Sequence, residues 1–148
     1  MSNKPIVIDA TNLILGRMLS YVAKKAIEGE QVIILNVSKA VISGGKRSTI
    51  QIARTKLRTR SLLSQDNGPV HPRRPENYAR RALRGMLPFK KPSGKKAYKR
   101  VSVYSDMPSQ YAQEPRQTIP GAQASKLKCR SILLEEFSRE IGGRVSSE

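Results

Sequence analysis

The amino-acid sequence predicts an α/β fold, and three features of its first 40 residues carry the prediction. Residues 5–9, PIVID, form a short apolar run of the kind found in strands that are covered on both faces. A second run of this kind, QVIILNV, follows at residues 31–37. The segment between them has the apolar spacing of an amphipathic helix. This order indicates a crossover unit with parallel strands and a right-handed connection.

The first helix is predicted to run from about Ile14 to Gly29. Apolar residues recur at every fourth position in two neighbouring rows that form one wide stripe: Ile14, Met18, Val22, Ala26 and Leu15, Leu19, Ala23, Ile27. Thr11 or Asn12 is expected to cap the helix at its start. Glycine is typical of the position where a helix stops.

A basic segment follows the second strand. Its Gly-Gly turn leads into a predicted helix in which Ile50, Ala53 and Leu57 face inwards. The arginines of this segment can point elsewhere: Arg47, Arg54, Arg58 and Arg60. Residues 65–76 are rich in proline and glycine and are expected to run over the surface.

A further helix is predicted to begin near Pro75, because proline is tolerated in a first turn. Its apolar positions again form two rows: Tyr78, Ala82, Met86 and Ala79, Leu83, Leu87. We expect the side chains of Met86 and Leu87 to pack into the core and hold this helix in place. The opposite side then presents Arg73, Arg80, Arg81 and Arg84.

The last third combines a strand, an arm and a short helix. Residues 100–108 are predicted to contain a strand that proline ends, and residues 109–126, without any period, an extended arm or loop. Residues 129–143 favour a strand and then a short helix, with Leu133, Leu134, Phe137 and Ile141 inwards and Glu135, Glu136 and Glu140 outwards, towards solvent or a basic neighbour. The simplest organisation is one domain over residues 1–148, with a core at 1–108 and an arm with the terminal strand and helix at 109–148.

Charge is distributed very unevenly along the chain. The chain has 28 Lys and Arg against 11 Asp and Glu, a formal net charge of +17, which draws in polyanions. Residues 39–104 hold 18 Lys and Arg against Asp66 and Glu76, a net of +16. Nearly the whole excess therefore lies in one block, as expected of a binding face.

Several catalytic and nucleotide-binding readings fit the residues poorly. SGGKRST resembles a phosphate-binding loop, but Ala40 and Arg47 stand where that loop needs glycine and Ser or Thr, so a turn into a helix is favoured. Asp9 ends a strand, where enzymes often place a carboxylate, yet an Asx-type turn with Thr11 and Asn12 is the expectation. His71 is expected to be a hydrogen-bonded loop residue, and one His and one Cys cannot supply a zinc set.

Cys129 is predicted to be a buried free thiol in a reducing compartment. No signal peptide opens the sequence and no apolar run reaches the ~20 residues of a membrane span, so a cytosolic protein is expected. Nucleic acid is the favoured partner, because Lys and Arg from several segments can neutralise phosphates over a wide area. Charge alone does not choose RNA over DNA, and a DNA-compacting protein, an anionic-membrane protein and an enzyme using Asp9 and His71 stay open as alternatives.

Residues 83–106, LRGMLPFKKPSGKKAYKRVSVYSD, closely resemble the hallmark of the thirteenth large-subunit ribosomal protein family. VIDATNLILGRMLSYVAK is similar to the opening strand and helix of that family, and VIILNVSKAVISG to its second strand. GPVHPRRPENYARRALRGMLP and ILLEEFSREIG are similar to its archaeal and eukaryotic branch, and the compact length favours archaea. The resemblance covers essentially the whole chain.

The resemblance implies a three-layer α/β/α fold around a mostly parallel four-stranded sheet, with extended loops and a C-terminal extension that ends in a short helix. It also implies a structural constituent of the cytoplasmic large ribosomal subunit, which binds 23S-type ribosomal RNA through a basic face, supports early assembly and touches neighbouring ribosomal proteins. No enzyme activity, cofactor, metal, membrane or small-molecule substrate is implied. The expected RNA contacts are the residues that match the RNA-contacting stretches of the family, together with the arginines of the helix predicted after the Gly-Gly turn. They are Arg17, Gly44, Gly45, Lys46, Arg47, Arg54, Arg58, Arg60, His71, Arg73, Arg74, Arg80, Arg81, Arg84, Gly85, Lys90, Lys91, Lys95, Lys96, Lys99 and Arg100. GMLP is interpreted as a knot that keeps its loop rigid.

Overall fold

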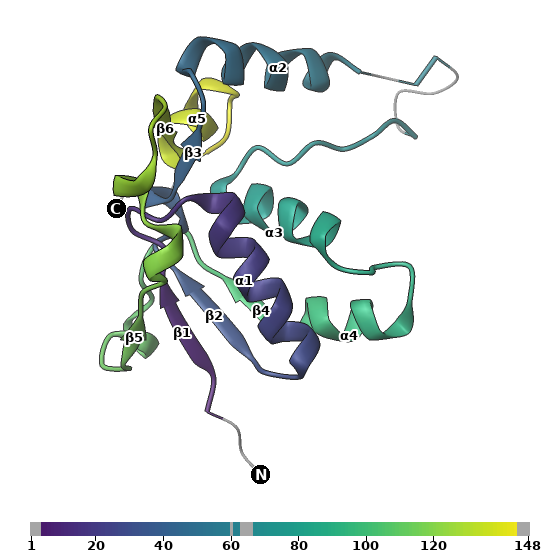
Figure 1. Ribbon diagram of the computed structural model, residues 1–148. Coiled ribbons are helices and arrows are strands. Elements are labelled where there is room, and N and C mark those ends of the chain that lie inside the picture. Colours follow the sequence, from purple (N-terminus) through teal and green to yellow (C-terminus); the bar gives the residue numbers. More distant parts are fainter. Residues whose placement is uncertain (1–3, 60, 63–66, 145–148) are drawn as a thin grey trace.

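The computed structural model describes residues 4–59, 61–62 and 67–144 (Figure 1). Its helices are α1 (Leu15–Glu28), α2 (Lys46–Arg58), α3 (Pro75–Met86), α4 (Pro92–Lys99) and α5 (Leu134–Glu140). Its strands are β1 (Ile6–Asp9), β2 (Val32–Leu35), β3 (Val41–Ser43), β4 (Val101–Val103), β5 (Arg116–Gln117) and β6 (Ser131–Leu133). The predicted RNA contact Arg60 and the acidic residue Asp66 lie outside the described residues.

The main sheet has four strands in the order β4-β2-β1-β5, and all neighbouring strands run parallel. Ile8 of β1 lies beside Ile34 of β2, which in turn lies beside Val103 of β4. Helix α1 connects β1 to β2, as the apolar runs of the sequence predict. The predicted α/β class with a mostly parallel four-stranded sheet is confirmed.

Alternation along the strands divides the apolar side chains between the two faces of the sheet. Ile8 and Ile34 belong to the large core, which α1 and α3 complete with fully buried residues such as Met18 and Leu83. The opposite face has a smaller cluster, formed by strand residues and two tyrosines of the segment after β4: Val7, Ile33, Leu35, Tyr104 and Tyr111. In the described part of the chain, the second covering layer is therefore built by a loop and a single 3-10 turn at Ser109–Tyr111.

A small second sheet carries α2 and α5 away from the main sheet. Strand β3 pairs antiparallel with β6, so that Ile42 lies opposite Ile132. Helix α5 follows β6 directly and buries Leu134 and Phe137 in the large core. Helix α2 buries only Ile50 fully and lies against α5 (Figure 1). The basic helix α2 and the basic helix α4 consequently lie at opposite ends of the molecule (Figure 1).

The fourth strand comes from a segment that the sequence analysis assigned to an arm or loop. Arg116 and Gln117 form β5 and pair with Val7 and Ile8 of the edge strand β1. Both β5 residues are exposed, because this short strand is held by main-chain hydrogen bonds and buries no side chain. The remainder of residues 109–126 forms turns, including short 3-10 helices at Pro120–Ala122 and Ala124–Lys126.

Helix α1 confirms most of its predicted pattern but not its predicted cap. Gly29 ends the helix with a left-handed backbone, at a φ of 110°. The residue before the helix is Ile14, whose side chain makes no capping hydrogen bond, so neither Thr11 nor Asn12 caps it. Ile27 lies past the buried stripe and is 55% exposed.

Three other burial predictions are wrong. Met86 is 41% exposed, because α3 ends there and the chain turns so that Leu87 alone enters the core. Leu133 is 45% exposed, because alternation along β6 sends Ile132 inwards and Leu133 outwards. Cys129 is exposed, because it precedes β6 in a segment that lies outside the core.

Candidate nucleic-acid interface

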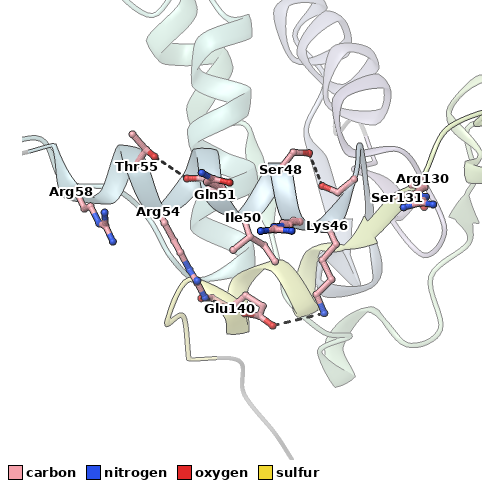
Figure 2. Close-up of a pocket in the computed structure, with 12 residues that line it drawn as sticks. Lys46, Ser48, Ile50, Gln51, Arg54, Thr55, Arg58, Arg130, Ser131 and Glu140 are labelled. Atoms are coloured by element: carbon pink, nitrogen blue, oxygen red, sulfur yellow. Dashed lines mark hydrogen bonds and ion pairs between the residues drawn. The ribbon is translucent and has the colours of Figure 1, made fainter.

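An open hollow of about 1160 Å³ runs along α2, and we call it the α2 groove. It is the hollow drawn in Figure 2, where Arg58 lies at one end and Arg130 at the other. Five of its lining residues are basic: Lys46, Arg47, Arg54, Arg58 and Arg130. Four of these five are among the predicted RNA contacts. The structure thus gathers cations from one helix and from the segment before β6.

The start of α2 is built by the Gly-Gly turn. Gly44 has a φ of 127°, which side chains rarely adopt, and its N–H donates to the carbonyl of Arg130 at 2.7 Å. Gly45 then occupies the position before the first helical residue, and the hydroxyl of Ser48 donates back to the Gly45 carbonyl at 3.0 Å. The glycine pair therefore both starts the helix and places Arg130 beside it.

Two carboxylates of α5 reach the cations of the α2 groove. The ammonium of Lys46 donates to Glu136 Oε1 and lies 3.8 Å from Glu140 Oε1. The guanidinium of Arg54 lies 3.3 Å from Glu140 Oε2, and Figure 2 shows Lys46 and Arg54 pointing from α2 towards Glu140. The hydrogen bond and the negative charge of Glu136 raise the pKa of Lys46. The sequence predicts that Glu136 and Glu140 face solvent or a basic neighbour. The structure instead pairs both with α2 of the same chain, while their side chains stay partly exposed.

A second basic hollow of about 610 Å³ lies where α3 passes into the loop before α4, and we call it the loop hollow. Its lining is Arg81, Arg84, Gly85, Leu87, Pro88, Phe89, Lys90 and Lys91. No acidic residue lines it, and within the described residues Arg81, Lys90 and Lys91 take part in no ion pair. All its cations were predicted to contact RNA.

Aromatic rings hold two arginines of α3 in place beside this hollow. The guanidinium carbon of Arg84 lies 4.3 Å from the ring centre of Phe89. Phe89 meets the ring of Tyr98 edge-on at 5.4 Å, and Arg80 lies 5.1 Å from the centre of the Tyr98 ring. Arg80 also donates to the hydroxyl of Tyr98 at 3.3 Å. Arg80 is half-buried in these contacts. Its main role is therefore to stabilise the packing around Tyr98, and it presents less of its charge to the surface than an exposed arginine does.

The GMLP segment packs tightly against α4. Leu87 is buried in the core, and the N–H of Lys91 donates to the Pro88 carbonyl at 2.9 Å. Gly94 of α4 lies so close that a Cβ there would stand 2.1 Å from the Pro88 oxygen. These contacts support the interpretation of GMLP as a knot, and they explain why the position holds glycine.

The remaining predicted contacts of α4 are mixed. Lys95, Lys96 and Lys99 are exposed on α4. Arg100, which follows the helix, is half-buried and donates to the carbonyl of Ala26 at 3.0 Å, so it links α4 to the end of α1. Its charge is therefore partly used inside the fold.

The other predicted contacts do not join the two hollows. Arg17 of α1 reaches the carbonyl of Gly121 at 3.5 Å. Arg74 pairs with Glu76 at 4.0 Å, and Arg73 lies against the end of α5, where its carbonyl accepts a hydrogen bond from Ser138. These arginines are exposed but lie apart from both basic hollows.

His71 lies in a third hollow of about 450 Å³ between α2 and α3. Pro72, Tyr78 and Ile141 line the same hollow, which is mostly apolar. The expected loop hydrogen bond is not formed at one nitrogen: His71 Nε2 is buried and has no hydrogen-bond partner among the described residues.

Asp9 has the structural role that the sequence analysis favoured. Its Oδ1 accepts hydrogen bonds from the N–H and hydroxyl of Thr11, at 3.0 and 2.7 Å, and from the Asn36 amide at 3.1 Å. Arg116 of β5 lies 3.9 Å from its other oxygen. Partial burial acts to raise the pKa of Asp9, but these hydrogen bonds and Arg116 outweigh it, so the pKa lies below its ordinary value. The Asx-type turn is confirmed with Thr11 and does not involve Asn12.

Sequence reasoning missed Arg130 as a member of the basic surface. Arg130 lies outside the block of residues 39–104 that holds the charge excess, in the short run KLKCR. It reaches the α2 groove because β6 pairs with β3, more than 80 residues away along the chain. The basic run itself was a signal, but nothing local specified its partner strand.

No helix among the described residues is long and apolar enough to cross a membrane. That part of the chain also has no group of three or more His, Cys, Asp and Glu that could hold a metal ion.

The fold and its two basic hollows define the class of this protein: it is a basic α/β protein that carries clusters of cations on its surface. A sequence model of the family described as "Ribosomal protein L13" matches residues 3–110. The chain belongs to this ribosomal protein family, which confirms the resemblance seen in the GMLP segment.

Relatives from three archaea extend the match over most of the chain. The "Large ribosomal subunit protein uL13" of Thermoplasma volcanium is 39% identical over 137 residues, which cover 93% of this chain and 98% of the relative. The protein of the same name from Methanococcoides burtonii is 37% identical over 139 residues, with 93% and 98% covered. That of Halobacterium salinarum is 36% identical over 142 residues, with 95% and 93% covered. These relatives are named as ribosomal proteins, a structural class, and not as enzymes.

Proposed function

We propose that this chain is a structural constituent of the large subunit of the cytoplasmic ribosome, and that it binds large-subunit ribosomal RNA through the α2 groove and the loop hollow. The observation that carries the proposal is the net charge of +16 in residues 39–104, most of which the fold displays on α2, α3 and α4. Family membership supports the ribosomal setting.

The placement of the two hollows supports a role in early assembly. Arginine forks bind phosphates in pairs, and lysines bind them as point charges. The two hollows share no lining residue: α2 and the segment before β6 line one, and the end of α3 and the loop before α4 line the other. One protein can therefore hold two separate RNA segments at a fixed distance. Holding two segments together lowers the entropic cost of folding the RNA between them, which is the contribution that we assign to this protein. Neighbouring ribosomal proteins are the expected further partners.

The dependence of RNA affinity on salt tests this proposal. If about ten phosphates are neutralised, log affinity falls against log salt with a slope between roughly −7 and −9. The probe is a transcript of the large-subunit RNA of an archaeal relative such as Thermoplasma volcanium. An affinity that hardly changes with salt contradicts the proposed electrostatic contact.

Assembly into the subunit provides an independent measurement. We expect the protein to sediment with large subunits through a salt wash, and folded Asp9→Asn and His71→Ala variants to do the same, because neither residue lies in the two basic hollows. Loss of incorporation in both folded variants contradicts the proposal and favours a site at Asp9 and His71.

A further inference from the structure

We propose that two carboxylates occupy the positions of RNA phosphates at the cations of the α2 groove, and that RNA displaces them when it binds. They belong to Glu140, which lines the groove, and to Glu136, which contacts Lys46 of the groove. The inference rests on the proposed RNA-binding function and specifies how one of its two surfaces works. In the free protein the two glutamates act as built-in competitors for the anion site.

The geometry of the groove supports a site for more than one phosphate. Lys46 contacts both carboxylates, whereas Arg54 contacts Glu140 through a side-chain oxygen at 3.3 Å and the main-chain carbonyl at 3.4 Å. Carboxylate and phosphate oxygens accept the same charge-assisted hydrogen bonds from Lys and Arg. A phosphate that takes the place of a carboxylate therefore meets donors that already point at it.

The ion pairs are exposed enough to be exchanged. The four side chains that form them are 38–56% exposed: Lys46, Arg54, Glu136 and Glu140. Ion pairs with this exposure are weak, because water screens them and both side chains lose freedom in forming them. Leu134 and Phe137 hold α5 in the core, so the glutamate side chains can turn away while the helix stays in place.

Other cations of the groove remain available to attract RNA before the exchange. Within the described residues Arg47, Arg58 and Arg130 line the groove and take part in no ion pair. An RNA strand held by these arginines brings its phosphates next to the glutamates. A non-specific polyanion makes fewer contacts with the other arginines than the specific RNA does, so it displaces the two carboxylates less often. The two glutamates therefore weaken non-specific binding more than specific binding.

A matched pair of single variants tests the proposal: Glu140→Gln and Glu135→Gln. Each removes one negative charge from α5, but Glu135 pairs at 2.7 Å with Arg139 of its own helix and not with α2. We expect Glu140→Gln to bind the Thermoplasma volcanium transcript roughly 1.5- to 5-fold more tightly than Glu135→Gln at low salt, since one exposed ion pair no longer has to be broken. Glu136→Gln combined with Glu140→Gln is expected to reach roughly 2- to 30-fold over the wild type.

The salt slope gives a second readout that a general change in charge does not predict. In the wild type, a groove cation that stays paired with Glu140 in part of the complexes neutralises no RNA phosphate there. Glu140→Gln frees this cation to neutralise a phosphate in every complex, so the slope becomes steeper than in Glu135→Gln by up to about 0.7 to 0.9. Equal affinities and equal slopes for the two single variants overturn the proposal.

The design separates failure of this inference from failure of the proposed function. A wild-type protein that binds the transcript without salt dependence contradicts the proposed function. If the wild type shows the expected salt slope but Glu140→Gln and Glu135→Gln bind RNA with the same affinity and slope, only the exchange at the groove is contradicted. All variants are first compared by circular dichroism and thermal melting. If the double Gln variant does not fold, Glu136→Asp with Glu140→Asp keeps the charges, shortens both side chains and is expected to give a smaller gain of the same sign, whereas no gain overturns the exchange.

Discussion

The α2 groove and the loop hollow contain similar numbers of cations but hold them in opposite ways. In the α2 groove, two glutamates of α5 neutralise Lys46 and Arg54. In the loop hollow, aromatic rings hold Arg84 and the neighbouring Arg80, and no acid lines the site. A ring fixes the direction of a guanidinium without cancelling its charge. A carboxylate fixes the direction and cancels the charge as well.

This difference assigns different roles to two surfaces that the sequence makes look alike. The loop hollow keeps its full positive field in the free protein, so we expect it to be the surface that attracts RNA first. The α2 groove gains its full field only after the glutamates have been displaced. We therefore expect RNA affinity to depend most strongly on the loop hollow.

The largest expected effect comes from removing the unpaired cations of the loop hollow. Arg81→Gln, Lys90→Gln and Lys91→Gln together are expected to weaken binding of the large-subunit RNA transcript by about 5 kcal/mol, because each charge-assisted contact is worth roughly 1.5–3 kcal/mol. The salt slope should become less negative by about 2 to 3. Filter binding at several salt concentrations measures both quantities.

A matched control removes the same charge elsewhere. Lys24, Lys126 and Lys128 are exposed and line neither basic hollow. Changing these three to Gln is expected to weaken binding by less than a third as much, through the long-range field alone. Equal losses in the two triple variants contradict the assignment of the loop hollow as the principal contact.

The second effect breaks the shape of the loop hollow and leaves its charge unchanged. Gly94→Ala places a methyl group 2.1 Å from the Pro88 oxygen, so the GMLP segment must move. We expect a loss of about 3 kcal/mol in the free energy of unfolding, at the upper end of the usual cost of overpacking. Urea unfolding followed by circular dichroism measures it.

Gly85 provides the control for this change, because it lies in the same loop hollow and an added Cβ would meet nothing within 4 Å. Gly85→Ala is expected to raise stability by roughly 0.5–1 kcal/mol, since Gly is unfavourable within a helix. A Gly94→Ala protein as stable as Gly85→Ala contradicts the close packing of GMLP against α4.

The sequence predicts those parts of the fold that bury their side chains. Strands β1 and β2 and the stripe of α1 leave apolar patterns, because the core selects each residue. Strand β5 leaves none, since Arg116 and Gln117 are exposed and contribute main-chain hydrogen bonds to an edge. The importance of the GMLP segment and Gly94 was indicated only by the family resemblance. Residue patterns could not predict their contact, because it depends on how the backbone brings Pro88 against Gly94.

The candidate site was predicted in composition but not in its pairing. The charge block located most of the cations in both hollows. No local pattern indicated that Lys46 would meet Glu136, which lies 90 residues further along the chain. Nor did the sequence show that Arg80 would be placed on Tyr98, because both residues also fit a solvent-exposed face. Long-range pairing decides which charges remain available.

A smaller effect distinguishes the structural acid Asp9 from the acids of the α2 groove. Asp9→Asn is expected to lower the free energy of unfolding by about 1 kcal/mol at neutral pH, because the hydrogen bonds from Thr11 and Asn36 lose their charge assistance. Its effect on RNA affinity should be negligible. Thermal melting and RNA titration measure the two quantities.

The pH dependence of this difference follows from the lowered pKa of Asp9. Its ordinary value is 3.8, and the folded protein holds the pKa below that value. The stabilisation is therefore complete at pH values well above 3.8 and is lost as the pH falls through the folded pKa. Wild type and Asp9→Asn should converge in stability towards low pH, and a difference that grows on acidification contradicts this assignment.

The smallest perturbation uses the exposed thiol next to the α2 groove. Cys129 precedes Arg130, which lines the groove, and its exposure predicts reaction with a maleimide fluorophore in the folded protein. Labelling should change stability by less than about 0.5 kcal/mol, as is usual for surface sites. Because RNA that enters the groove passes beside the label, its emission should change during RNA titration, and in the Glu140→Gln protein it should change at a lower RNA concentration. A label that reacts only after denaturation contradicts the exposed position of Cys129. A label that reacts but stays unchanged while RNA binds shows that RNA uses the loop hollow and not the α2 groove.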